Sequence, residues 1–190
     1  MNNFMIALFI LTSCNSENPP PQKTQILTST KHAAAKKSDF DNYAFHCCSE
    51  KTLNSALNSY LKLVQAMGDD DEQKSLASFS DLSTSIEQLQ IPEKDNLISE
   101  FSKINSDSLT SLRDSFSLFS SAFIKVVQLQ KANDLQTETT SKEPKPSTKQ
   151  LKKISVAFCP MAPGRWLQTS NIIHNPYFGS EMLTCGVFEQ

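Results

Sequence analysis

Apolar side chains recur every three or four residues through residues 49–132, the spacing that places them on one face of an α-helix. Short polar connections divide this region into four stretches. The first covers about residues 50–67, and Gly68 is expected to end it in the left-handed conformation. The other stretches carry Leu76 to Leu89, Leu97 to Ile104, and Leu109 to Val127. This pattern predicts a mainly α protein, folded as an antiparallel four-helix bundle.

Two features of this region favour structural roles over ligand binding. The acidic run Asp69 to Glu72 opposes the helix dipole at the next helix start, and it lacks the interleaved spacing and glycine of a calcium loop. We therefore expect a solvated helix cap. Phe116, Phe119 and Phe123 share one helix face and are expected in the core.

The chain after the helices changes character. Residues 133–150 are polar, contain Pro144 and Pro146, and predict a linker. In the C-terminal segment, 151–190, residues 154–158 alternate like a strand and 186–188 form a second extended piece. We expect an irregular loop and short-strand segment docked on the bundle, whose regular structure would be a two-stranded ribbon. This segment is too small for its own core, so a disulfide, a metal or packing should pin it.

The N-terminus predicts export. An apolar run from Phe4 to Leu11 is too short to span a bilayer but fits a secretory signal, and Leu11-Thr12-Ser13-Cys14 resembles a bacterial lipobox. We therefore expect residues 1–14 to be a lipoprotein signal peptide, with Cys14 carrying acyl chains such as palmitate. Residues 15–48 would be a flexible tether to the membrane. Asn15 after the lipidated cysteine favours the outer membrane, with the folded part facing the periplasm.

The C-terminal segment concentrates side chains that bind soft metals. Copper(I) and silver accept thiolate, thioether and imidazole, whereas zinc rarely accepts thioether. The candidate ligands are Cys159, Met161, His174, Met182 and Cys185. Trp166, the only tryptophan, is a candidate cation–π cap on such a site.

A disulfide is the competing interpretation. An exported protein meets an oxidising compartment, where Cys159 and Cys185 would pair and lose their thiolates. The residues alone favour neither the bond nor the metal. His46, Cys47 and Cys48 form a further thiol patch, either a second soft-metal or redox site or a loop with buried thiols.

The C-terminal motif also carries a resemblance. Its residues are C-P-M-A from Cys159, Trp166-Leu167, N-P-Y-F-G from Asn175, Met182-Leu183 and Cys185-Gly186, with support from Tyr60, Asp69 to Asp71, Arg113, Phe116 and Ser120. The chain resembles an uncharacterised bacterial periplasmic helical domain. That domain occurs in exported lipoproteins and is appended to adaptor subunits of heavy-metal (CusB-type) efflux pumps. The resemblance implies copper at Cys159, Met161, Met182 and Cys185, an efflux adaptor or another copper protein as partner, and no enzymatic activity.

Other function classes receive little support. The formal net charge of −2 does not suggest nucleic acid as a partner. A catalytic Cys159–His174 pair lacks an orienting residue in any recognisable motif. We therefore expect a lipoprotein that handles copper(I) or silver. The alternative is a structural or interaction lipoprotein whose C-terminal segment is pinned by a Cys159–Cys185 disulfide.

Overall fold

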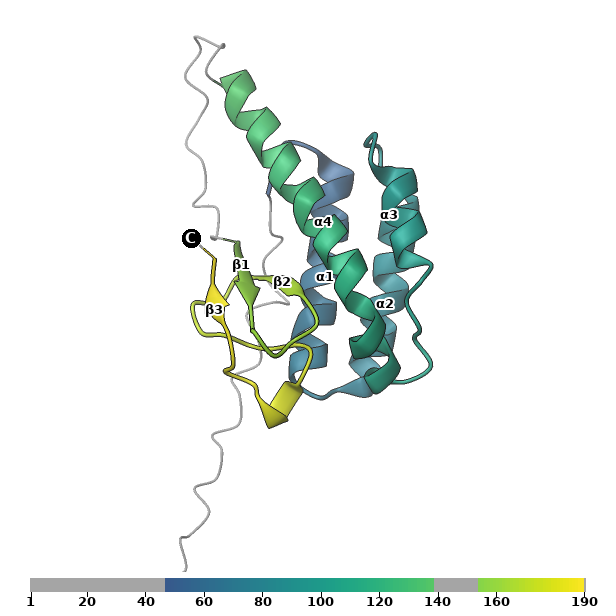
Figure 1. Cartoon of the computed structure of the whole chain (residues 1–190). Coiled ribbons are helices and arrows are strands. Elements are labelled where there is room, and N and C mark those ends of the chain that lie inside the picture. The colour runs from purple at the N-terminus through teal and green to yellow at the C-terminus, as the bar shows by residue number, and fades with distance from the viewer. Residues whose placement is uncertain (1–46, 139–153, 190) are drawn as a thin grey trace, which may run out of the picture. The chain divides into compact units, whose positions relative to one another are not determined.

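The computed structural model describes residues 47–138 and 154–189 (Figure 1). These residues form a mainly helical structure with a small sheet, so the predicted fold class is confirmed at that level. The predictions for the signal peptide with Cys14, for most of the tether and for His46 lie outside the described residues. The helices are α1 (Lys51–Gly68), α2 (Glu72–Glu87), α3 (Lys94–Phe101) and α4 (Leu109–Glu138). The strands are β1 (Ser155–Phe158), β2 (Arg165–Gln168) and β3 (Val187–Phe188), with a 3-10 turn, η2, at Gly179–Glu181.

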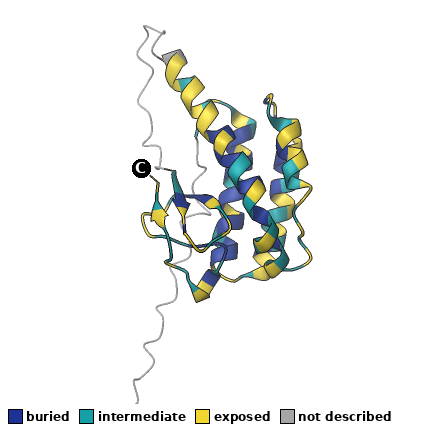
Figure 2. Cartoon of the chain, viewed as in Figure 1, coloured by how far each residue is buried: buried dark blue, intermediate teal, exposed yellow. Residues whose placement is uncertain are grey.

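Helix α1 supplies much of the core. It packs mainly on α2, and it also contacts α4, β2 and η2. Tyr60 in α1 stacks on Phe123 of α4, with ring centroids 4.9 Å apart, and lies 5.6 Å from Phe116. Phe116, Phe119 and Phe123 are fully buried, which confirms the core role expected for them. The C-terminal part of α4 is largely exposed (Figure 2). Among the described residues, no helix has the length and apolar character needed to cross a bilayer.

The turn between α1 and α2 differs from the sequence expectation. Asp71 does cap α2, because its side chain accepts a hydrogen bond from the Lys74 amide at 3.0 Å. The left-handed residue, however, is Asp70 (φ 57°) and not Gly68, which remains in α1. Aspartate tolerates this conformation better than most residues do. Gly68 is needed for another reason, the close approach of His174 described below.

Helix α4 continues to Glu138, whereas the sequence predicts a linker from residue 133 onward. Residues 133–138 contain no proline or glycine that would end a helix, and the first proline is Pro144. A tertiary contact also holds this end, since Asp134 accepts hydrogen bonds from the Ser49 amide at 2.5 Å and the Ser49 hydroxyl at 2.7 Å. The rest of the predicted linker lies outside the described residues.

The C-terminal segment contains a three-stranded antiparallel sheet, in the order β2-β1-β3, and not a two-stranded ribbon. Val156 pairs with Leu167, and Phe158 pairs with Val187. The strand missing from the sequence prediction is β2. Its last three residues are all buried, so it lacks the alternation that identifies a half-exposed strand. Strand β2 is also the strand that packs against α1 and α4, and it thereby docks the sheet on the helices.

Candidate functional site

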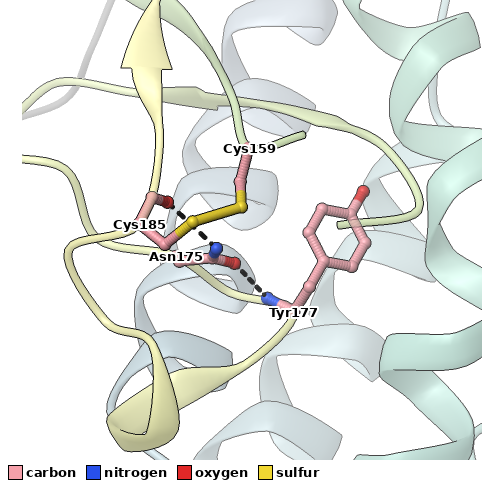
Figure 3. Close-up of a disulfide and its surroundings, with 4 residues drawn as sticks. All are labelled: Cys159, Asn175, Tyr177 and Cys185. Atoms are coloured by element: carbon pink, nitrogen blue, oxygen red, sulfur yellow. Dashed lines mark hydrogen bonds between the residues drawn. A yellow bond between two sulfur atoms is a disulfide. The ribbon is translucent and has the colours of Figure 1, made fainter. Parts of the chain in front are cut away.

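A disulfide joins the two cysteines of the C-terminal segment (Figure 3). Cys159 directly follows β1 and is fully buried, while Cys185 precedes β3. The buried Asn175 lies beside the bond. Its side-chain amide donates to the Cys185 carbonyl at 3.1 Å, and its carbonyl oxygen accepts from the Tyr177 amide at 2.9 Å. The bond therefore supplies one of the pins that a segment without its own core requires.

The disulfide changes what the predicted soft ligands can do. While it is present, neither Cys159 nor Cys185 offers a thiolate. Met161 is 62% exposed, and Met182 is half-buried. Among the described residues, no group of three or more His, Cys, Asp or Glu side chains is arranged to hold a metal ion.

His174 is held at the end of α1. Its Nε2 lies 3.1 Å from Asp69 Oδ1 and 3.2 Å from Gln65 Nε2. Gly68 is directly beneath the ring, where a Cβ would overlap Cδ2 and Nε2 of the imidazole. Through these contacts, His174 lies in the interface between the C-terminal segment and the end of α1.

Trp166, the candidate cation–π cap, occupies the core. It is fully buried, its Nε1 donates to Gln168 Oε1 at 2.8 Å, and its ring meets Tyr177 edge-on at 6.1 Å. Gln168 in turn donates to the Ile172 carbonyl at 2.8 Å and accepts from the His174 amide at 3.2 Å. Trp166 therefore orders the loop that leads to His174.

The acidic run before α2 attaches the C-terminal segment to the helices, a role that we did not predict. Asp70 accepts hydrogen bonds from Arg113 of α4 at 2.5 Å and from the Ser180 amide of η2 at 2.7 Å. Arg113 also donates to the carbonyls of Pro176 (2.9 Å) and Met67. We call this set the Asp70–Arg113 latch. Its sequence signal was an acidic run longer than a single helix cap requires.

The latch perturbs the titration of its carboxylate. Burial raises the pKa of Asp70, but hydrogen bonds from Ser180 and Arg113 outweigh that effect and lower the pKa to about 2. Asp70 is therefore charged at neutral pH, as its ion pair with Arg113 requires.

A buried hydrogen-bond network forms the second attachment of the sheet. The Tyr60 hydroxyl donates to Ser120 Oγ at 2.6 Å and accepts from the Leu167 amide at 3.2 Å. Ser120 Oγ donates to the Arg165 carbonyl at 2.6 Å, which also accepts from the Tyr177 hydroxyl at 3.1 Å. Burial raises the pKa of Tyr60, so its hydroxyl stays protonated. The network joins α1, α4 and β2.

Cys47 and Cys48, the described residues of the thiol patch, lie apart from these contacts, just before α1. Cys47 and Cys48 are not disulfide-bonded, both are half-buried, and their sulfurs are 3.0 Å apart. The described part of the chain thus has two kinds of cysteine, one bonded pair and one thiol pair.

Comparison with known proteins found no matching family model, no matching curated protein and no similar solved structure. The resemblance to the periplasmic efflux-associated domain therefore stays a prediction.

Proposed function

We propose that this protein is an exported, lipid-anchored binding module of the cell envelope, without enzymatic activity, whose C-terminal segment is pinned by the Cys159–Cys185 disulfide. The observation that supports this proposal is the pairing of these two cysteines within a small, loop-rich segment. Disulfides of this kind persist in oxidising compartments and are rare in the cytosol. The lipobox-like sequence ending at Cys14 points independently to the periplasmic side of a membrane, with the outer membrane favoured.

The helices would serve as the platform of this module. We infer that α1 to α4 form an antiparallel four-helix bundle, because all four contribute side chains to one continuous apolar core. The Asp70–Arg113 latch and the Tyr60 network then fix the sheet against α1 and α4. A rigidly attached segment suits recognition, because it loses little conformational entropy on binding. The resemblance suggests a heavy-metal efflux adaptor as the partner.

Lipid attachment is tested with the full chain produced in a bacterium. We expect labelled palmitate on the wild-type chain and its recovery in the membrane fraction. The Cys14→Ala variant should lose the label and remain in the uncleaved precursor form. The control variant Cys48→Ala should behave like the wild type. Equal labelling of the Cys14→Ala and wild-type chains would contradict the proposal.

Copper(I) or silver binding by the reduced C-terminal segment is a second proposal. It is favoured by the exposed Met161, which lies two positions from Cys159 in a segment that also contains Met182 and Cys185. Reduction would free two thiolates there, and soft monovalent ions accept thiolate and thioether together. Exposed ligands would permit transfer of the ion to a partner.

Titration with copper(I) under anaerobic conditions tests this second proposal. The reduced chain should bind more tightly than the oxidised chain and more tightly than a Cys159→Ala, Cys185→Ala double variant. If all three bind equally, the C-terminal segment is not a copper(I) site.

A further inference from the structure

The Cys47–Cys48 pair is a preformed dithiol. Its two sulfurs are 3.0 Å apart and lie just before α1. Both side chains are half-buried, so solvent and small solutes reach them. The contacts that attach the C-terminal segment involve neither residue, which leaves the pair without a role in the proposal above.

Adjacent cysteines resist oxidation to a relaxed disulfide. Their Cα atoms are about 3.8 Å apart across a trans peptide, below the range of about 4.4–6.8 Å that ordinary disulfides occupy. Cys159 and Cys185, in contrast, have a Cα–Cα distance of 5.8 Å. In an oxidising compartment the chain should therefore close the Cys159–Cys185 bond and keep Cys47 and Cys48 as thiols.

Two side chains, Asn54 and Asp134, hold the backbone around the dithiol. Asn54, which is 5% exposed, accepts a hydrogen bond from the Cys47 amide at 2.7 Å. Its amide nitrogen donates to the Cys48 carbonyl at 2.8 Å. Asp134 of α4 holds the next residue, Ser49, through two further hydrogen bonds. These hydrogen bonds order the backbone of the two cysteines before any ligand binds, which reduces the entropic cost of binding.

The two thiols also differ in acidity. A hydrogen bond from Cys47 lowers the pKa of the Cys48 thiol, and the same contact, together with burial, raises the pKa of Cys47. Glu50 and Asp134 nearby oppose thiolate formation at Cys48 but do not reverse the shift. Cys48 is therefore the more acidic thiol of the pair.

The sulfur separation selects the kind of ligand. A two-coordinate ion in line between the sulfurs, with bonds of about 2.3 Å, would need them about 4.6 Å apart. A pyramidal trivalent centre holds its sulfurs much closer together, as they are here. We propose that Cys47 and Cys48 form a chelating site for trivalent arsenic compounds. With an organic arsenoxide, two S–H bonds and the As=O bond break, two As–S bonds form, and one water leaves, without oxidation or reduction.

The probe is phenylarsine oxide, added to the full chain carrying Cys14→Ala and purified without reductant. This substitution removes Cys14, so that Cys47 and Cys48 are the only cysteines outside the Cys159–Cys185 disulfide. Intact mass should show one arsenical per chain, with loss of one water. The adduct should survive excess glutathione and be removed by dithiothreitol, because two As–S bonds resist a monothiol but not a competing dithiol.

Further Cys47→Ala or Cys48→Ala substitution should each abolish the glutathione-resistant adduct. A chain whose thiols are first blocked with N-ethylmaleimide should also form none, which tests the site without a change of sequence. The Cys159→Ala, Cys185→Ala variant should keep the adduct. The proposal is overturned if the purified chain has Cys47 and Cys48 already oxidised, if no adduct forms, or if either single variant retains it.

Discussion

At the scale of single residues, two glycines allow the C-terminal segment and the helices to approach each other closely. A Cβ at Gly68 would overlap the His174 ring, and one at Gly179, where φ is +53°, would overlap Asp70 and Arg113. The sequence marks Gly68 as a helix-ending residue and Gly179 as part of the N-P-Y-F-G motif. It could not show that side chains distant in the sequence approach them, because such contacts exist only once the segment has docked.

Substitution of Gly68 should have opposite effects in two backgrounds. Gly68→Ala should destabilise the wild-type chain by about 1–3 kcal/mol, because the methyl group displaces the His174 imidazole. In a His174→Ala background the same change should be neutral or stabilising, since alanine favours a helix by up to about 1 kcal/mol. Urea unfolding of the four proteins measures the coupling. An equal cost in both backgrounds would show that the two residues do not meet.

Because of the Asp70–Arg113 latch, the free energy of unfolding should depend on pH in the acidic range. The pKa of Asp70 is lowered in the folded state from its usual 3.8 to about 2, so its contribution is fully present above about pH 4 and is lost as the pH falls toward 2. Asparagine also tolerates the left-handed conformation of residue 70. The Asp70→Asn variant should be less stable than the wild type at pH 7, and its free energy of unfolding should fall less than that of the wild type between pH 4 and pH 2. Denaturant unfolding across that range measures this, with the exposed Asp114→Asn as control. Parallel curves for Asp70→Asn and the wild type would contradict the latch.

At the scale of elements, β2 is the strand that connects the sheet to the helices. The Tyr60 hydroxyl of α1 accepts a hydrogen bond from the Leu167 amide of β2 and donates one to Ser120 of α4. One hydroxyl therefore links three elements. The helical periodicity placed Tyr60 on the buried face of its helix, but nothing in the sequence paired it with β2.

Removing that hydroxyl should weaken the whole attachment. Tyr60→Phe leaves the buried Leu167 amide without its acceptor, which should cost about 1–3 kcal/mol and speed hydrogen exchange at that amide. Tyr177→Phe is the matched control. It removes a donor to the Arg165 carbonyl, which Ser120 still satisfies, so its cost should be smaller. A larger cost for Tyr177→Phe would place the main attachment elsewhere.

The sequence predicted the elements that have a simple periodicity. Helices α1, α2 and α4 are long enough for their apolar spacing to locate them, and the proline at position 92 marked the start of the short α3. Strand β2 was missed because Trp166, Leu167 and Gln168 are all buried. The sequence predicts too early an end for α4 because residues 133–138 contain a single apolar residue, Leu135, and so show no apolar face that would mark them as helical.

At the scale of the whole molecule, the disulfide joins the end of β1 to the chain just before β3. The sequence identified Cys159 and Cys185 but could not decide between a bond and an ion, because both need the same two sulfurs close together. The acidic run pointed to Asp70, but nothing in the sequence paired Asp70 with Arg113 of α4 and Ser180 of η2.

Removing the disulfide should destabilise the folded chain as a whole. The double variant Cys159→Ala, Cys185→Ala should lose about 3 kcal/mol, the chain-entropy contribution of a loop of this length. Denaturant unfolding without reductant measures the loss. The Cys47→Ala, Cys48→Ala variant should change stability much less, because its residues close no loop. Comparable losses in both double variants would mean that the first pair acts through packing alone.

The state of the four described cysteines in the cell tests the central claim most directly. Cells producing the full chain are quenched in acid, alkylated under denaturing conditions without reductant, and analysed by peptide mass mapping. We predict that Cys159 and Cys185 escape alkylation and are recovered as one linked peptide pair, while Cys47 and Cys48 are both alkylated. Alkylation of Cys159 and Cys185 in most chains would contradict an exported, disulfide-pinned protein.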